Sequence, residues 1–101
     1  MSIGPGQPIN VFDVVGVALA PSVAGVYAIC RADGSYVYFG HAENIRQRLT
    51  AHLIDGNSCI HREGAAAFAY ELCEASSLRV ARQNQLLATY PTRCNPAMSA
   101  V

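Results

Sequence analysis

Hydrophobic and polar residues alternate in two short runs on either side of the dipeptide Asp33-Gly34, between Gly25 and Gly40. Alternation with a period of two is typical of a β-strand whose two faces have different surroundings. Asp-Gly readily supplies the two positive φ angles of a type I′ turn, which joins antiparallel strands. The pattern therefore predicts a β-hairpin over residues 25–40.

The expected turn fixes which residues of the two strands lie opposite each other. A two-residue turn at 33–34 pairs Ile29 with Tyr38 and Tyr27 with Gly40, and directly opposed residues share a face. We expect one polar-tipped face and one apolar core face: the first carries Tyr27, Ile29, Arg31, Tyr36, Tyr38 and Gly40, and the second Val26, Ala28, Cys30, Val37 and Phe39. Because Gly40 has no Cβ, we also expect a notch through which another group can approach the phenol of Tyr27.

Helical spacing of apolar residues recurs before and after the hairpin. A helix is expected from Asn10, a possible cap, to about Leu19, and a second from its cap Asn44 to about Ile54. Each helix has a stripe that we expect to face inward: Val11, Val14, Val15 and Ala18 in the first, and Ile45, Leu49, His52 and Leu53 in the second. Arg48 lies at the edge of the second stripe.

The second half of the chain predicts a third strand and a last helix. Residues 55–64 are polar and without periodicity, so we expect an irregular loop, whereas residues 65–73 alternate as a strand does. Ser76 or Ser77 can cap a helix from about Leu78 to Thr89, which Pro91 ends. One face of that helix carries Gln83, Leu86, Leu87 and Tyr90. We therefore expect an α/β (α+β) domain over residues 10–101, with a three-stranded, mostly antiparallel sheet flanked by helices, preceded by a flexible tail over residues 1–9.

Length and charge limit the functions that this domain can have. A chain of 101 residues, 51% of them apolar, suits one core. All seven basic residues are arginine and seven residues are acidic, so the formal charge is zero. A free-standing nucleic-acid binder usually carries excess positive charge, so the balance argues against tight unaided binding, although Arg46 with Arg48, and Arg79 with Arg82, could still form a local basic face.

The sequence indicates neither a membrane or secreted protein nor a structural zinc site. No apolar run has the length of a membrane span, and no signal peptide is visible, so we expect no membrane association and a cytoplasmic location. The four cysteines, Cys30, Cys59, Cys73 and Cys94, are scattered. Cys59 and His61 could share a ligand site, but a structural zinc needs four ligands and no second pair is present, so we favour buried free thiols.

Three sequence motifs resemble those of the GIY-YIG nuclease family. They are Gly25-Val26-Tyr27, Tyr38-Phe39-Gly40, and the helix after the hairpin, which carries an arginine, Arg48. The order of the pieces continues to match as far as Asn95. The resemblance implies the family's fold and a metal-dependent endonuclease activity that hydrolyses phosphodiester bonds of nucleic acid, with DNA as the expected partner.

The resemblance also implies roles for individual residues. Tyr27 matches the proposed general base, which requires a lowered phenol pKa, and Tyr38 matches the tyrosine that orients water or phosphate. Arg48 matches the arginine that binds phosphate, a task suited to its planar guanidinium. The remaining matches are His52 as a proton shuttle or phosphate ligand, Gly40 and His41 as substrate-binding positions, and Asn95 as the residue that ties its loop to the site. Taken alone, each residue type also has an ordinary structural use, such as strand packing for tyrosine and a solvated helix charge for arginine.

Gln83 departs from the family pattern, because it stands where the resemblance implies a metal-binding glutamate for Mg²⁺ or Mn²⁺. An amide oxygen is a neutral and weaker ligand. Losing a unit charge at contact distance costs about 4 kcal/mol at an effective dielectric of about 20, roughly a thousandfold in binding. Glu71 and Glu74 are the nearest acids in sequence, and neither has the family's spacing. The chain is therefore expected to be a weakened or inactive nuclease or, alternatively, a non-catalytic module that binds nucleic acid or a protein partner.

Overall fold

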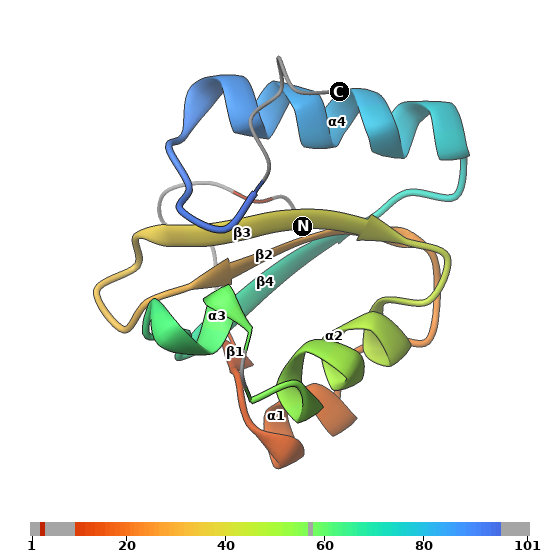
Figure 1. The fold of residues 1–101 in the computed structure, drawn as a ribbon. Coiled ribbons are helices and arrows are strands. Elements are labelled where there is room, and N and C mark those ends of the chain that lie inside the picture. Colours follow the sequence, from red (N-terminus) through yellow and green to blue (C-terminus); the bar gives the residue numbers. More distant parts are fainter. Residues whose placement is uncertain (1–2, 4–9, 57, 96–101) are drawn as a thin grey trace.

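The computed structural model describes residues 3, 10–56 and 58–95, and these form a sheet covered by helices on both faces (Figure 1). In chain order the elements are β1 (Asn10–Val11), α1 (Val14–Ala18), β2 (Gly25–Cys30), β3 (Tyr36–Ala42), α2 (Ile45–Ile54), α3 (Cys59–Arg62), β4 (Ala67–Leu72) and α4 (Ser76–Thr89). The strand order is β1-β4-β2-β3, and every neighbouring pair is antiparallel. The expected fold class is confirmed, with four strands in place of three.

The central strand β2 is buried on both faces, which corrects the expected division into a core face and a polar face. One core, on the side of α1, α2 and α3, contains Tyr27, Ile29 and Phe68. The other core, under α4, contains Val26, Ala28 and Phe39. Helices cover both sides of the sheet, so every residue of β2 is shielded from water.

The hairpin between β2 and β3 contains two irregularities that together preserve the expected pairing. Gly34 has a φ of 89° and its amide bonds to the carbonyl of Arg31 at 2.9 Å, so the turn has three residues and is not type I′. The resulting shift pairs Cys30 with Tyr36, and a bulge then leaves Val37 without an opposing residue on β2. Beyond the bulge, the two predicted pairs, Ile29 with Tyr38 and Tyr27 with Gly40, are present. The bulge also reverses two predicted faces, because Val37 joins the core of Tyr27 and Tyr36 packs beside α4.

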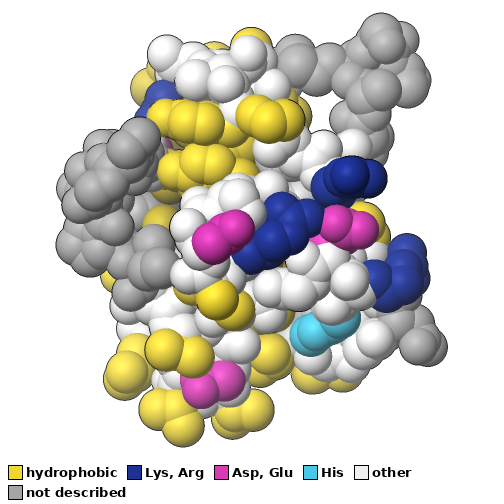
Figure 2. All heavy atoms as spheres, turned by 90° about the vertical axis from the view of Figure 1, so that its left-hand side faces the viewer, with side chains coloured by type: hydrophobic (Ala, Val, Ile, Leu, Met, Phe, Trp, Pro, Cys, Tyr) yellow, Lys and Arg dark blue, Asp and Glu magenta, His cyan; other side chains and the backbone are white. Residues whose placement is uncertain are grey.

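The first predicted helix is wrong in extent and in orientation. Asn10 and Val11 form a short strand, and Asp13 caps α1 by accepting a hydrogen bond from the amide of Gly16 at 2.7 Å. Phe12, Val17 and Ala20 are buried, whereas all four residues of the predicted stripe are exposed. Figure 2 shows hydrophobic side chains gathered at the lower end of the molecule, where α1 lies, and Val14, Val15 and Leu19 there are more than 70% exposed.

The other predicted helices and the strand are close to those observed. Asn44 caps α2 through the amide of Gln47 at 3.0 Å, and Ile45 and Leu49 are buried as expected. In α4, Leu86 is buried and Gln83 is half-buried, but no side chain caps the helix. The loop over 55–64 contains the short helix α3.

The arginines of α4, for which the sequence left a local basic face open, both serve the fold. Arg79 is only 5% exposed and donates to the carbonyl oxygens of Cys73 and Glu74. Arg82 forms an ion pair with Glu71, with Nε 3.0 Å from Oε2. Glu71 also accepts a hydrogen bond from the amide of Ile3, so the carboxylate is fully engaged.

Two cysteines form a disulfide, which corrects the expectation of four free thiols. Cys59 and Cys94 are bonded, with their Cα atoms 5.6 Å apart, whereas Cys30 and Cys73 are free. Sequence separation gave no sign of this pairing. The predicted tail lies outside the described residues except for Ile3, which is buried under α4. None of the helices in the described residues is long and apolar enough to cross a membrane.

Candidate active site

Two tyrosines and a histidine meet on the α2 side of the sheet, and we call Tyr27, Tyr38 and His52 the Tyr–His cluster. Tyr27 comes from β2, Tyr38 from β3 and His52 from the last turn of α2. The hydroxyl of Tyr27 lies 2.8 Å from Nε2 of His52. The ring centroids of Tyr38 and His52 are 5.2 Å apart in an edge-on arrangement, and those of the tyrosines are 6.1 Å apart. The structure therefore brings together these three predicted site residues.

Electrostatics in the cluster favour a neutral phenol. Burial raises the pKa of Tyr27, Tyr38 raises it further, and Arg48 opposes them by a smaller lowering. Burial also lowers the pKa of His52, and the positive charge of Arg48 lowers it again. At neutral pH the hydroxyl of Tyr27 and an uncharged His52 thus share a hydrogen bond. In this pair the group ready to take up a proton is the imidazole, because the phenol lacks the lowered pKa that a general base requires.

His61 positions the cluster and was missed as a site residue by the sequence. Its Nε2 donates to the carbonyl oxygen of His52 at 2.8 Å, and its ring packs 5.9 Å from that of Phe12. This bond ties α3 to the C-terminal turn of α2, which carries His52. The only sequence signal was the proximity of His61 to Cys59, and it points to metal binding instead.

The expected notch at Gly40 is present but is filled by Tyr27. A Cβ added at residue 40 would lie closer than 3.0 Å to three atoms of Tyr27: Cζ, Oη and Cε1. The phenol, only 1% exposed as a residue, lies directly against the backbone of β3. Gly40 therefore permits the position of Tyr27 and leaves no room for a further group at this point.

A second group of site residues surrounds the backbone of Phe39, and we call Asn95, Gln83 and His41 the Phe39 clamp. The Asn95 side chain accepts from the Phe39 amide at 2.8 Å and donates to its carbonyl oxygen at 2.7 Å. Gln83 Nε2 donates to the same carbonyl oxygen at 3.0 Å. Its Oε1 is then free to accept a hydrogen bond from Nδ1 of His41. The predicted role of Asn95 in tying its loop back has a direct structural counterpart.

The two groups lie on opposite faces of one short piece of edge strand. Tyr27 belongs to the core on the α2 side, whereas Val26, which pairs with His41, belongs to the core under α4. Opposed residues share a face, so His41 faces α4, which carries Gln83. The sequence predicts a single cleft lined by Tyr27, Tyr38, Arg48, His52 and Gln83, and this prediction is wrong for Gln83, which lies on α4 on the other side of the sheet from Tyr27.

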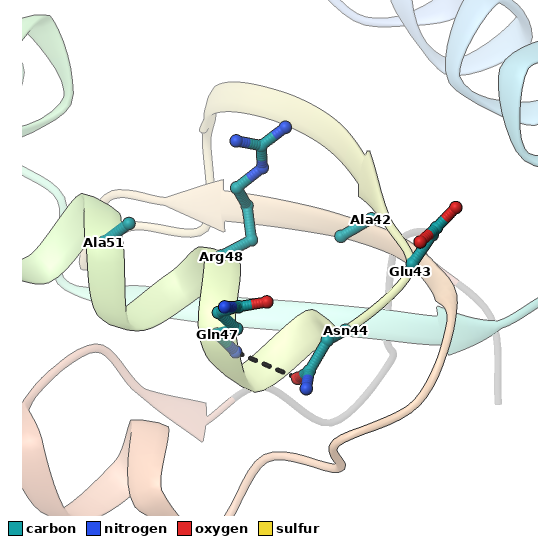
Figure 3. Close-up of a pocket in the computed structure, with 6 residues that line it drawn as sticks. All are labelled: Ala42, Glu43, Asn44, Gln47, Arg48 and Ala51. Carbon is teal, nitrogen blue, oxygen red and sulfur yellow. Dashed lines mark hydrogen bonds between the residues drawn. The ribbon is translucent and has the colours of Figure 1, made fainter.

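Arg48 lies beside the Tyr–His cluster and faces solvent. It lines an open pocket of about 480 Å³ with Ala42, Glu43, Asn44, Gln47 and Ala51. In Figure 3 the Arg48 side chain extends from α2 toward the β3 ribbon, while Glu43 points in another direction. Among the described residues Arg48 forms no ion pair. Its guanidinium is thus available to an anion that enters from solvent.

The residues at the expected metal position do not fit a magnesium ion. Magnesium requires anionic oxygen ligands, whereas both polar atoms of Gln83 already have hydrogen-bond partners within the Phe39 clamp. Glu71 is held by Arg82, and Glu74 is exposed at the start of α4. In the part of the chain that the structure describes, no group of three His, Cys, Asp or Glu residues could hold a metal.

The chain matches the family model of the GIY-YIG catalytic domain over residues 23–87. Its structure is similar to that of the GIY-YIG N-terminal endonuclease domain of UvrC from Thermotoga maritima, solved as a point mutant bound to its catalytic divalent cation. The match has a TM-score of 0.69 at 22% identity, and covers 80% of this chain and 91% of that one. The magnesium-bound form of that domain matches with a TM-score of 0.68 at 22% identity, over 79% and 91% of the two chains. No curated protein sequence matches. The family match covers well over half of the chain and includes both tripeptides and Arg48, and the chain belongs to the GIY-YIG catalytic domain family.

Proposed function

We propose that this chain is an endonuclease domain directed to the phosphodiester bonds of nucleic acid, with DNA as its partner, and that its metal-dependent cleavage is weak or absent. The observation that carries the proposal is a contrast between two parts of the site. The Tyr–His cluster and Arg48 are assembled, whereas Gln83 provides a neutral amide whose polar atoms are already bonded. The group that fails is therefore the expected ligand for Mg²⁺ or Mn²⁺.

The assembled residues support binding and proton transfer. Arg48 offers two parallel N–H donors to a phosphate group, the geometry in which guanidinium binds it best. Tyr27 and His52 are linked by a hydrogen bond along which a proton can move toward His52, and Tyr38 lies against both. Since Arg48 lines a pocket that is open to solvent, a phosphate group of a nucleic-acid strand can approach its guanidinium there.

Plasmid nicking tests the proposal, with Mg²⁺ or Mn²⁺ and three forms of the chain: wild type, Gln83→Glu, and Gln83→Glu with Tyr27→Phe. We expect little or no nicking by the wild type, an increase with Gln83→Glu, and loss of that increase when Tyr27 is also changed. The Gln83→Glu variant should fold, because Phe39 keeps its two hydrogen bonds to Asn95 and the new carboxylate can still accept a hydrogen bond from His41. A wild type that nicks as fast as Gln83→Glu would contradict the role given to residue 83.

A non-catalytic binding module of cytoplasmic location is the second candidate, and one observation favours it. Both polar atoms of the Gln83 amide have hydrogen-bond partners within the Phe39 clamp, so this side chain already has a structural use that needs no metal. If Gln83→Glu remains inert while the wild type binds labelled DNA in the presence of a chelator, the chain is such a module. Arg48→Ala should then weaken that binding, whereas Arg62→Ala, at an exposed position on α3, provides the comparison.

A further inference from the structure

The exposed edge of β3 is covered by the segment that follows α4. Within residues 10–56 and 58–95, β3 has a strand neighbour on the β2 side alone, so its outward backbone groups need other partners. The amide of Cys94 bonds to the carbonyl of Val37 at 3.2 Å, and the Asn95 side chain takes both backbone groups of Phe39. Cys94 and Asn95 thus act as a substitute for a neighbouring strand.

A disulfide bond fastens this segment to α3. Cys94 is bonded to Cys59, the first residue of α3, which lies on the face of the sheet opposite to α4 (Figure 1). The chain therefore descends from α4, passes over the edge of β3 and is anchored on the far side. Both cysteines are half-buried, so their sulfurs lie near the surface.

We propose that Cys59–Cys94 is a thiol–disulfide exchange site that controls how firmly the Phe39 clamp is held. A dithiol attacks one sulfur, forms a mixed disulfide and then leaves as its own cyclic disulfide. The Sγ–Sγ bond breaks, and Cys59 and Cys94 gain the two electrons and two protons that the dithiol loses. Without the anchor, Cys94 and Asn95 keep only noncovalent contacts, which are their hydrogen bonds to β3 and the packing of Cys94 against the core.

Release of Asn95 also changes the surroundings of Gln83, because both side chains donate to the same carbonyl oxygen. The carbonyl oxygen of Phe39 accepts from both Asn95 and Gln83, and Gln83 holds His41. When Asn95 leaves, this oxygen and the Phe39 amide become accessible to water. Any effect of this change on DNA cleavage rests on the proposed function, whereas the loosening of the edge does not.

The two other cysteines offer matched controls. Cys30 is buried, and burial raises its pKa to about 11, so its thiol is poorly reactive. Cys73 is free and half-buried like the bonded pair, but it lies at the end of β4, away from the clamp. A Cys73→Ser variant therefore shows whether the effect of a reductant depends on Cys73, for example through a disulfide between two chains, and not on the proposed pair.

Amide hydrogen exchange, followed by NMR on the full chain with and without dithiothreitol, tests the proposal. Alkylation after denaturation should label two thiols in the oxidised chain and four in the reduced chain. We expect the Phe39 amide to exchange at least about ten-fold faster after reduction, while the Ala28 amide in β2 changes little. Cys59→Ser with Cys94→Ser should match the reduced chain without any reductant, and Cys73→Ser should respond as the wild type does.

A second variant separates local loosening from general unfolding. Asn95→Ala should accelerate Phe39 exchange by a similar factor with the disulfide intact, and reduction should then add little further acceleration. Unchanged Phe39 exchange after reduction would overturn the proposal, as would equal acceleration at Ala28 or four thiols in the oxidised chain. Nicking by Gln83→Glu in both redox states is measured separately, so an inert chain leaves the exchange result intact.

Discussion

Replacing Gly40 with alanine tests the packing on which the Tyr–His cluster depends. The new Cβ would overlap Cζ and Oη of Tyr27 and would need about 1 Å of relief to reach an ordinary contact distance of 3.4 Å. Tyr27 cannot swing away, because its residue is 1% exposed and its ring packs against Tyr38 and His52. The strain must therefore move the phenol or β3.

We estimate the cost from two effects. Overpacking a well-filled core costs about 1–3 kcal/mol. Displacing the Tyr27 hydroxyl from His52 loses a partly buried hydrogen bond, which adds about 0.5–1.5 kcal/mol. Gly40→Ala should thus lower the free energy of unfolding by about 2–4 kcal/mol, a large part of the stability of a domain of this size.

Urea unfolding followed by circular dichroism measures this change, with Gly56→Ala as the control. A Cβ at residue 56 would meet no atom within 4 Å, and that glycine does not have a positive φ. The control should therefore unfold within about 0.5 kcal/mol of the wild type. If Gly40→Ala is equally mild, Tyr27 does not lie against β3 as described, and the geometry of the cluster is wrong.

Three further changes have definite expected results. Arg79→Ala should lower the free energy of unfolding by about 2–4 kcal/mol in urea titrations, because it leaves two carbonyls of the β4–α4 loop without their buried donor. Changing Cys59 and Cys94 to serine should cost about 3–4 kcal/mol under oxidising conditions, because the bond closes a long loop in the unfolded chain, and nothing under reducing conditions. The pKa of His52 is lowered from 6.5 in the folded chain, so the unfolded chain takes up the proton first and stability should fall as the pH drops from about 7 toward 5. Thermal unfolding should show this slope in the wild type and a flatter one in His52→Gln.

Local signals predicted those elements whose boundaries depend on neighbouring residues. Asn44 followed by apolar residues at helical spacing placed α2 correctly, because a cap and a periodic stripe are both local. The pairing of Tyr27 with Gly40 was also predicted, although two compensating irregularities lie between the turn and that pair. Its correctness therefore depends on the bulge at Val37 as well as on the assumed turn.

Features that depend on contacts between distant residues could not be predicted. The valines near the N-terminus show helical spacing, but the sheet selects Phe12 and Val17 for burial and leaves the valine stripe exposed. The bond between Cys59 and Cys94 arises only because the chain crosses the edge of β3. Likewise, the sequence motifs placed eight residues at one site, but the structure divides the Tyr–His cluster and the Phe39 clamp between two faces of the sheet.

The role of residue 83 is tested by a titration of Mn²⁺, followed by its electron paramagnetic resonance signal, in wild type and Gln83→Glu. We expect the wild type to leave Mn²⁺ free at millimolar concentration and the variant to bind it at least about a hundredfold more tightly, because a unit charge at contact distance is worth about 4 kcal/mol. Equal binding by the two forms, whether tight or absent, would show that residue 83 does not control metal binding.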